Sequence, residues 1–128
     1  MKYAVIGARI LLGLIFFVFG LNGFLNFIEA PPMTGDASTF IGILAGSGYL
    51  YVVKLIEIVG GLALLTGRFV PLGLTLLGPV IVNIMLFHGF LAPEGLPVPI
   101  VTVLLEGFLI WAYRKNFAPV FAAVAKAA

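Results

Sequence analysis

Four long apolar segments separated by short polar ones dominate the sequence. They cover residues 4–28, 49–66, 69–91 and 98–113. A helix rises about 1.5 Å per residue, so about 20 residues cross a hydrocarbon layer of about 30 Å. The pattern therefore predicts an all-α fold, a four-transmembrane-helix bundle that forms a single transmembrane domain over residues 1–128.

The connection at residues 29–48 interrupts this pattern. Pro31 and Pro32 end the first helix, and the apolar run TFIGILA that follows is too short to span a bilayer. We expect a short interfacial or re-entrant helix there, beginning at an Asp36 or Ser38 cap. A surface loop with a few apolar anchors is the alternative.

Composition indicates what solvent these segments face. Of the 128 residues, 62% are hydrophobic and 9% are charged, whereas a soluble domain has about 25% charged residues. The polar surface is too small to cover a water-exposed globule. The lipid bilayer is therefore the predicted partner of most of the chain, which we expect to be a multi-pass integral membrane protein. Lys2 gives a basic start, but no A-x-A-like site precedes Pro31, so we expect an uncleaved first helix rather than a signal peptide.

Basic residues mark one side of the predicted bundle. Five of them lie at the termini or in the turn after the second helix: Lys2, Arg68, Arg114, Lys115 and Lys126. The other two connections hold only acidic residues: Glu29, Asp36 and Glu94. Positive charge favours the cytoplasmic side, so both termini, including a tail at residues 114–128, should be cytoplasmic. The basic residues stand singly at segment ends, so no nucleic-acid partner is expected.

Glycines are frequent inside the apolar segments. Seven of them are placed to let neighbouring helices approach closely: Gly13, Gly20, Gly60, Gly61, Gly73, Gly78 and Gly107. A glycine-rich bundle of this size also favours a homo-oligomer.

Polar side chains inside the apolar segments are the candidates for function. Seven of them fall in the outer half of the predicted bundle and form the predicted ligand-binding set: Asn22, Asn26, Lys54, Glu57, Asn83, His88 and Glu106. A charge near the bilayer centre costs about 2.5–3.5 kcal/mol on insertion scales, so such groups generally face the bundle interior. We therefore predict a polar layer shared by all four helices.

The ionisable residues inside the apolar segments also have structural explanations. Lys54 and Glu57 are three residues apart on one helix face and can form a salt bridge that only makes their burial tolerable. His88 can be a hydrogen-bonded structural group. Glu106 has no partner one turn away, so it must find one across the bundle or keep its proton. Arg9 lies near a helix end and can extend to the cytoplasmic headgroups.

A carboxylate, an imidazole and an amide in an apolar cleft suit a quinone, whose carbonyl groups accept hydrogen bonds and protons during reduction. Glu57, Glu106 and His88 are the proton-transfer candidates, and no catalytic residue is assigned. The sequence has no cysteine, which excludes thiolate metal sites and cysteine nucleophiles. No spacing typical of metal ligands is present, so no metal is predicted.

Two stretches carry a family resemblance: ARILLGLIFFVFGLNGFLNF in the first helix, and KLIEIVGGLALLTGRFVPLG across the second and third. The most specific part is E-x-x-G-G-x-x-L-L-x-G-R, which begins at Glu57. The chain resembles the DoxX family of small four-helix membrane proteins. That family includes the DoxD-type subunit of a thiosulfate:quinone oxidoreductase and proteins linked to quinones or oxidative stress. The resemblance implies a redox setting in a bacterial or archaeal plasma membrane, and points to Arg9, Asn22, Glu57 and His88.

Three classes of function follow. The first is a quinone-linked or redox-stress-associated membrane subunit that works with a soluble or membrane redox partner. If it is an enzyme, it is at most a membrane subunit of a quinone-linked oxidoreductase. The second is a carrier for a small apolar or weakly acidic molecule, against which the lack of any internal repeat counts. The third is a non-catalytic assembly or structural membrane protein.

Overall fold

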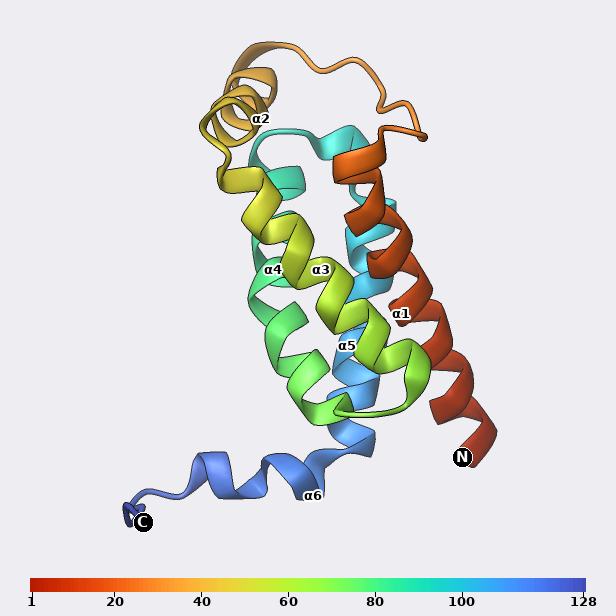
Figure 1. The fold of residues 1–128 in the computed structure, drawn as a ribbon, viewed down its shortest axis with the longest axis vertical. Coiled ribbons are helices and arrows are strands. Elements are labelled where there is room, and N and C mark those ends of the chain that lie inside the picture. The colour runs from red at the N-terminus through yellow and green to blue at the C-terminus, as the bar shows by residue number, and fades with distance from the viewer.

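The computed structural model describes residues 1–128 and contains helices and no strands, which confirms the predicted all-α class. Its elements are α1 (Lys2–Leu25), α2 (Gly35–Ser47), α3 (Tyr49–Thr66), α4 (Val70–Phe90), η1 (Pro93–Gly95), α5 (Pro97–Ala112), α6 (Arg114–Phe117) and η2 (Ala118–Phe121). The four long helices α1, α3, α4 and α5 run side by side (Figure 1).

Three of the helices, α1, α3 and α4, are long and apolar enough to cross a membrane, and the fourth long helix is shorter. α5 has 16 residues and is therefore about 24 Å long. It reaches the length of a span only together with the α6–η2 segment, from which it is bent by 80°. The fold thus provides three spans, or four if this bent pair counts as one.

The two ends of the bundle differ in charge. One end, called the basic end here, is formed by the N-terminus, the turn at residues 67–69 and the end of α5 (Figure 1). The other, the loop end, is formed by residues 26–34, α2 and residues 91–96. The five basic residues of the termini and the turn thus belong to the basic end and its tail, and the acidic connections to the loop end.

The first helix ends three residues earlier than the predicted boundary at residue 28. Asn26 adopts a left-handed conformation (φ 52°, ψ 43°) and caps the helix through its N–H, which donates to the Asn22 carbonyl. The Asn22 side chain then holds Ile28: its Nδ2 donates to the Ile28 carbonyl at 3.2 Å, and its Oδ1 accepts from the Ile28 N–H at 2.7 Å. Asparagine tolerates the left-handed conformation better than most residues, so the helix can end at Asn26.

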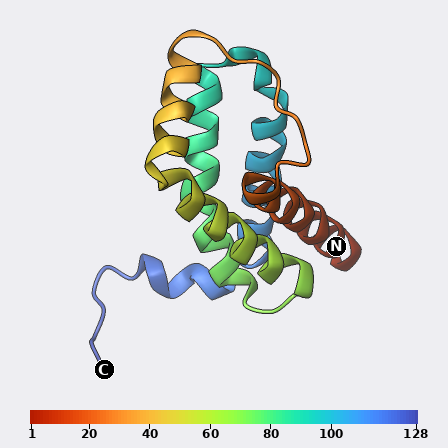
Figure 2. The ribbon, with the colours of Figure 1, turned by 45° about the horizontal axis from the view of Figure 1, so that its top comes forward.

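The predicted short helix between the first two spans is present as α2. It has 13 residues and begins at Gly35, without a side-chain cap from Thr34. The predicted start at an Asp36 or Ser38 cap is therefore wrong. Glycines in the left-handed conformation lie at its two ends, Gly35 as its first residue (φ 64°) and Gly48 directly after its last (φ 86°). Figure 2 shows α2 beside α4, where the rings of Phe40 and Phe87 lie 5.7 Å apart.

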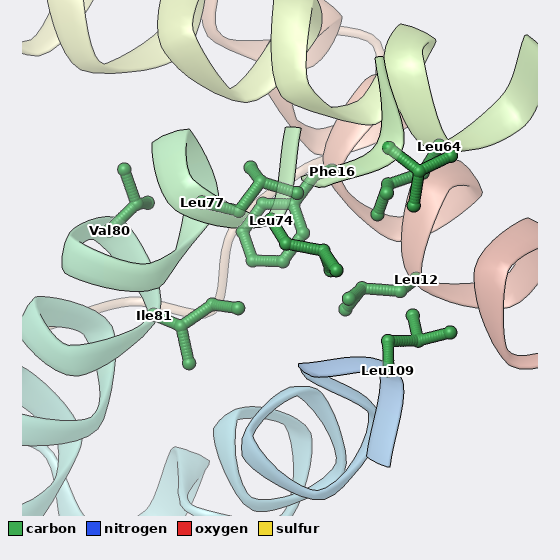
Figure 3. Close-up of a cluster of buried hydrophobic side chains, with 9 residues drawn as sticks. Leu12, Phe16, Leu64, Leu74, Leu77, Val80, Ile81 and Leu109 are labelled. Atoms are coloured by element: carbon green, nitrogen blue, oxygen red, sulfur yellow. The ribbon is translucent and has the colours of Figure 1, made fainter. Parts of the chain in front are cut away.

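An apolar core fills the half of the bundle nearer the basic end. Its largest fully buried side chains are leucines from all four long helices: Leu12, Leu64, Leu74, Leu77 and Leu109 (Figure 3). Phe16, Val80 and Ile81 continue this cluster toward the middle of the bundle.

Glycines bring α1 and α3 into backbone contact. A Cβ atom added to Gly61 would lie 2.7 Å from the Phe17 nitrogen and 2.9 Å from the Gly13 oxygen. A Cβ atom on Gly60 would lie 2.7 Å from Leu77 of α4. Gly107, by contrast, has no atom within 4 Å of an added Cβ, so the close approach predicted for it does not occur within this chain.

Candidate functional site

A cavity of about 780 Å³ lies in the half of the bundle nearer the loop end, between all four long helices and α2. Nineteen residues line it, and 13 of them are hydrophobic. Phe16 and Val80 belong to both the core cluster and the cavity lining. The cavity therefore rests directly on the apolar core.

Besides the Tyr49 hydroxyl group, five polar side chains line this apolar cavity. Four are predicted site residues, Lys54 and Glu57 from α3 and Asn83 and His88 from α4; the fifth is Thr102 from α5. Sequence reasoning missed Thr102, although its four-residue spacing from Glu106 places both on one helix face. Thr102 and Glu106 are indeed both buried, at 2% and 5% exposure.

Lys54 and Glu57 form the ion pair that their spacing on one helix permits. Lys54 Nζ lies 3.4 Å from Glu57 Oε1. The two side chains differ in exposure, at 21% for Lys54 and 3% for Glu57. The carboxyl group is therefore enclosed by protein, while the lysine keeps some access to the surroundings.

His88 is held in one orientation by its neighbours. Its Nδ1 lies 3.2 Å from the Ala92 carbonyl oxygen. Because a carbonyl oxygen can only accept, Nδ1 must carry the proton in this contact. Nε2 then remains free to accept a hydrogen bond from a ligand. The ring also packs edge-on against Phe87, with centroids 5.1 Å apart, and its atoms would collide with a Cβ on Gly95.

Asn83 and Thr102 are partly satisfied by their own helices. Asn83 Nδ2 donates to the Pro79 carbonyl at 2.8 Å, and Thr102 Oγ1 donates to the Pro99 carbonyl at 2.7 Å. These bonds use donor capacity and leave the Asn83 Oδ1 and the Thr102 lone pairs as acceptors. Both residues therefore offer acceptors to the cavity wall.

Asn22 and Asn26 do not join this cavity. They line a second one of about 530 Å³ at the loop end, together with Glu29 and Tyr51. Lys54 lines both cavities. The predicted single polar layer is thus divided into two parts that share one lysine.

Two further predicted residues lie outside both cavities. Glu106 is buried, neither of its carboxyl oxygens has a hydrogen-bond partner, and Oε2 would lie 3.4 Å from a Cβ on Gly78. Of the two alternatives for Glu106, a partner across the bundle or retention of its proton, the first is not found. Arg9 packs its guanidinium group against Gly67 at the basic end, and its Nε has no partner. No three His, Asp or Glu side chains are grouped to hold a metal ion.

Apolar helices long enough to span a bilayer, packed around a cavity with few charged side chains, define a small polytopic helical membrane protein. Residues 4–92 match the profile of the DoxX family, so the chain belongs to that family. The match covers α1 to α4 and therefore Lys54, Glu57, Asn83 and His88, but not Thr102 or Glu106. No curated protein and no solved structure matches the chain.

Proposed function

We propose that this DoxX protein binds a quinone in the larger cavity and acts as the membrane subunit of a quinone-linked redox system. The observation that carries the proposal is the combination of an apolar cavity of about 780 Å³ with Lys54, Glu57 and His88 on its wall. Pockets for small molecules typically enclose about 300–1,000 Å³ and combine apolar walls with a few polar groups.

The lining fits the chemistry of a quinone. A quinone ring is flat and apolar with carbonyl acceptors, and Phe19 and Phe87 offer aromatic surface for it. The Lys54 ammonium group can donate to a carbonyl oxygen. His88 Nε2, left free by the bond from Nδ1 to Ala92, can accept from a quinol hydroxyl group or, when protonated, donate to a carbonyl.

A bound quinone supplies two-electron, two-proton chemistry, with the electrons coming from a soluble or membrane redox partner. The chain's own residues would donate protons to the quinone and accept protons from the quinol. The Glu57 carboxyl group and the His88 imidazole stand on α3 and α4, on two walls of one cavity. Each can hold a proton beside a ligand oxygen, which is the role of a general acid or base.

The proposed setting is the plasma membrane of a bacterium or archaeon, with four spans and both termini in the cytoplasm. The basic residues at the termini and the α3–α4 turn support this orientation. It places the cavity in the outer half of the membrane. Assembly into a homo-oligomer remains a prediction from the size and glycine content of the bundle.

Binding can be tested with decylubiquinone and the purified protein in nanodiscs. We expect the wild type to retain the quinone through size-exclusion chromatography, measured by extraction and absorbance. Glu57→Gln should weaken binding about tenfold, because it removes an interaction of about 1.4 kcal/mol from the wall. Glu94→Gln is the matched control, because Glu94 is exposed and lines neither cavity.

Two results would contradict the proposal. One is a wild-type protein that retains no decylubiquinone. The other is equal retention by wild type, Glu57→Gln and Glu94→Gln, which would place any bound quinone away from the larger cavity.

A further inference from the structure

Lys54 stands between two cavities of different character. The larger one is mainly apolar, whereas the second has Asn22, Asn26, Glu29 and Tyr51 in its wall. The two share Lys54 together with Ile41 and Leu50. The second cavity lies at the loop end, where the chain between α1 and α2 is exposed. A charged group therefore connects the end of the bundle to its interior.

Two glycines of α1 lie against Lys54, Gly23 beside its side chain and Gly20 beside its backbone. A Cβ atom on Gly23 would lie 2.5 Å from Lys54 Cγ and 2.8 Å from Lys54 Cδ, and one on Gly20 would lie 3.1 Å from the Lys54 carbonyl oxygen. The aliphatic stem thus passes along the bare backbone of α1. This path brings Nζ to within 3.4 Å of Glu57 Oε1 while 21% of the lysine side chain stays exposed.

The opposite route from Glu57 to water is closed. Between the larger cavity and the basic end lie Leu12, Leu64, Leu74, Leu77 and Leu109, each 0% or 1% exposed. These side chains offer no hydrogen-bonding group, and water is not stable in an apolar site of this kind. The buried polar atoms on that side, Arg9 Nε and the Glu106 carboxyl oxygens, have no hydrogen-bond partner, so no hydrogen-bonded chain leads from Glu57 to the basic end.

We propose that the second cavity is an aqueous vestibule, and that Lys54 is the group through which the buried Glu57 exchanges protons with water at the loop end. In one transfer, the Lys54 ammonium group gives a proton to the Glu57 carboxylate, and water or a buffer acid in the vestibule replaces it. The net change is one proton moved from the aqueous phase to Glu57. That this proton continues to a quinone rests on the proposed function; the route does not.

Other titratable groups surround this pair. Glu29, which follows α1, and Tyr51 of α3 line the vestibule, and Tyr49 of α3 and His88 of α4 line the larger cavity. Glu106 of α5 is buried outside both. α1 and α2 contribute no titratable side chain to either wall. Glu57 therefore has Lys54 as its one hydrogen-bonded partner and its nearest link to the vestibule.

Acylation of the Lys54 amine by sulfosuccinimidyl acetate tests this route on the wild-type protein. The reagent does not cross membranes and reacts only with a deprotonated amine, so labelling requires both contact with water and release of the proton. In sealed vesicles with the loop end outward, mass spectrometry should find Lys54 labelled and Lys115, at the basic end, unlabelled. No quinone is needed, so failure of quinone binding leaves this result unchanged.

Two variants test the connection between the groups. Glu57→Gln removes the carboxylate that holds the ammonium group, so Lys54 should be labelled at least threefold faster. Gly23→Ala should change the Lys54 labelling rate at least threefold by displacing the stem. Gly7→Ala, also in α1 but with no atom within 4 Å of its added Cβ, should match the wild type.

Three results would overturn the proposal. They are an unlabelled Lys54, a Lys54 labelled only from the side that labels Lys115, and a labelling rate that Glu57→Gln leaves unchanged. Circular dichroism spectra of both glycine variants confirm that they are folded before their rates are compared.

Discussion

The members of the Lys54–Glu57 ion pair should respond unequally to substitution, because the protein encloses one of them more fully than the other. Glu57 is 3% exposed and Lys54 is 21% exposed, with 3.4 Å between Nζ and Oε1. Lys54→Met leaves an enclosed carboxyl group without a hydrogen-bond donor. Glu57→Leu leaves an ammonium group that still reaches the second cavity. Lys54→Met should therefore destabilise the protein more than Glu57→Leu does.

The magnitudes follow from this geometry. At 3.4 Å and an effective dielectric constant of about 20, two unit charges attract by about 5 kcal/mol. Desolvation of both groups offsets most of this energy. Breaking a buried pair by removing one member costs about 3–5 kcal/mol. We expect about 3 kcal/mol for Lys54→Met, about 1 kcal/mol for Glu57→Leu, and less than about 1 kcal/mol for the double variant, whose apolar pair needs no partner.

The assay is equilibrium unfolding in mixed micelles, followed by far-ultraviolet circular dichroism, for the wild type and all three variants. Decylubiquinone retention is measured on the same samples. The double variant should regain stability without regaining quinone binding. The reasoning is refuted if the two single variants are equally destabilised, or if the double variant is as unstable as Lys54→Met. A stable double variant that binds quinone normally would assign the pair a structural role only.

Two further predictions concern the framework of the cavity. Gly61→Ala should lower the unfolding free energy by about 1–3 kcal/mol, because its Cβ would meet backbone atoms of Phe17 and Gly13. The control Gly7→Ala, whose Cβ has open space, should differ from the wild type by less than about 0.5 kcal/mol in the same micelle assay. Equal unfolding free energies for the two variants would contradict the backbone contact. Leu64→Ala, which leaves a void at a side chain with 0% exposure, should lower the unfolding free energy by about 2–4 kcal/mol. Quinone retention by the folded fraction should stay normal. Loss of quinone retention would show that the apolar core shapes the larger cavity.

The long helices could be predicted because their apolar runs are continuous and their boundaries fall at glycines and prolines. The turn after α3 is an example, since Gly67 is left-handed at φ 72° and Pro71 lies in the first turn of α4. The end of α1 could not be predicted in this way. It depends on Asn26 adopting a left-handed conformation and on Asn22 bonding to Ile28, and neither event leaves a hydrophobicity signal.

The sequence predicts how far each candidate side chain lies from the end of the bundle. It does not predict toward which neighbouring helix that side chain points. Counting residues from the helix ends places Lys54, Glu57 and Glu106 at similar depths. Their directions depend on how the helices pack. α5 turns Glu106 toward Gly78 of α4 rather than into a cavity. Asn22 lines the second cavity and not the larger one.

The same packing argues for a site that opens toward one side of the membrane over a carrier that opens toward both. A carrier must expose its ligand to each side in turn, and the bundle would have to separate at Leu12, Leu64 and Leu109 to open toward the basic end. Those side chains are fully buried. Gly13 and Gly61 lock α1 to α3 at the same level through backbone contact. α2, by contrast, has one buried residue, Ala37, so the loop end is the end that can open.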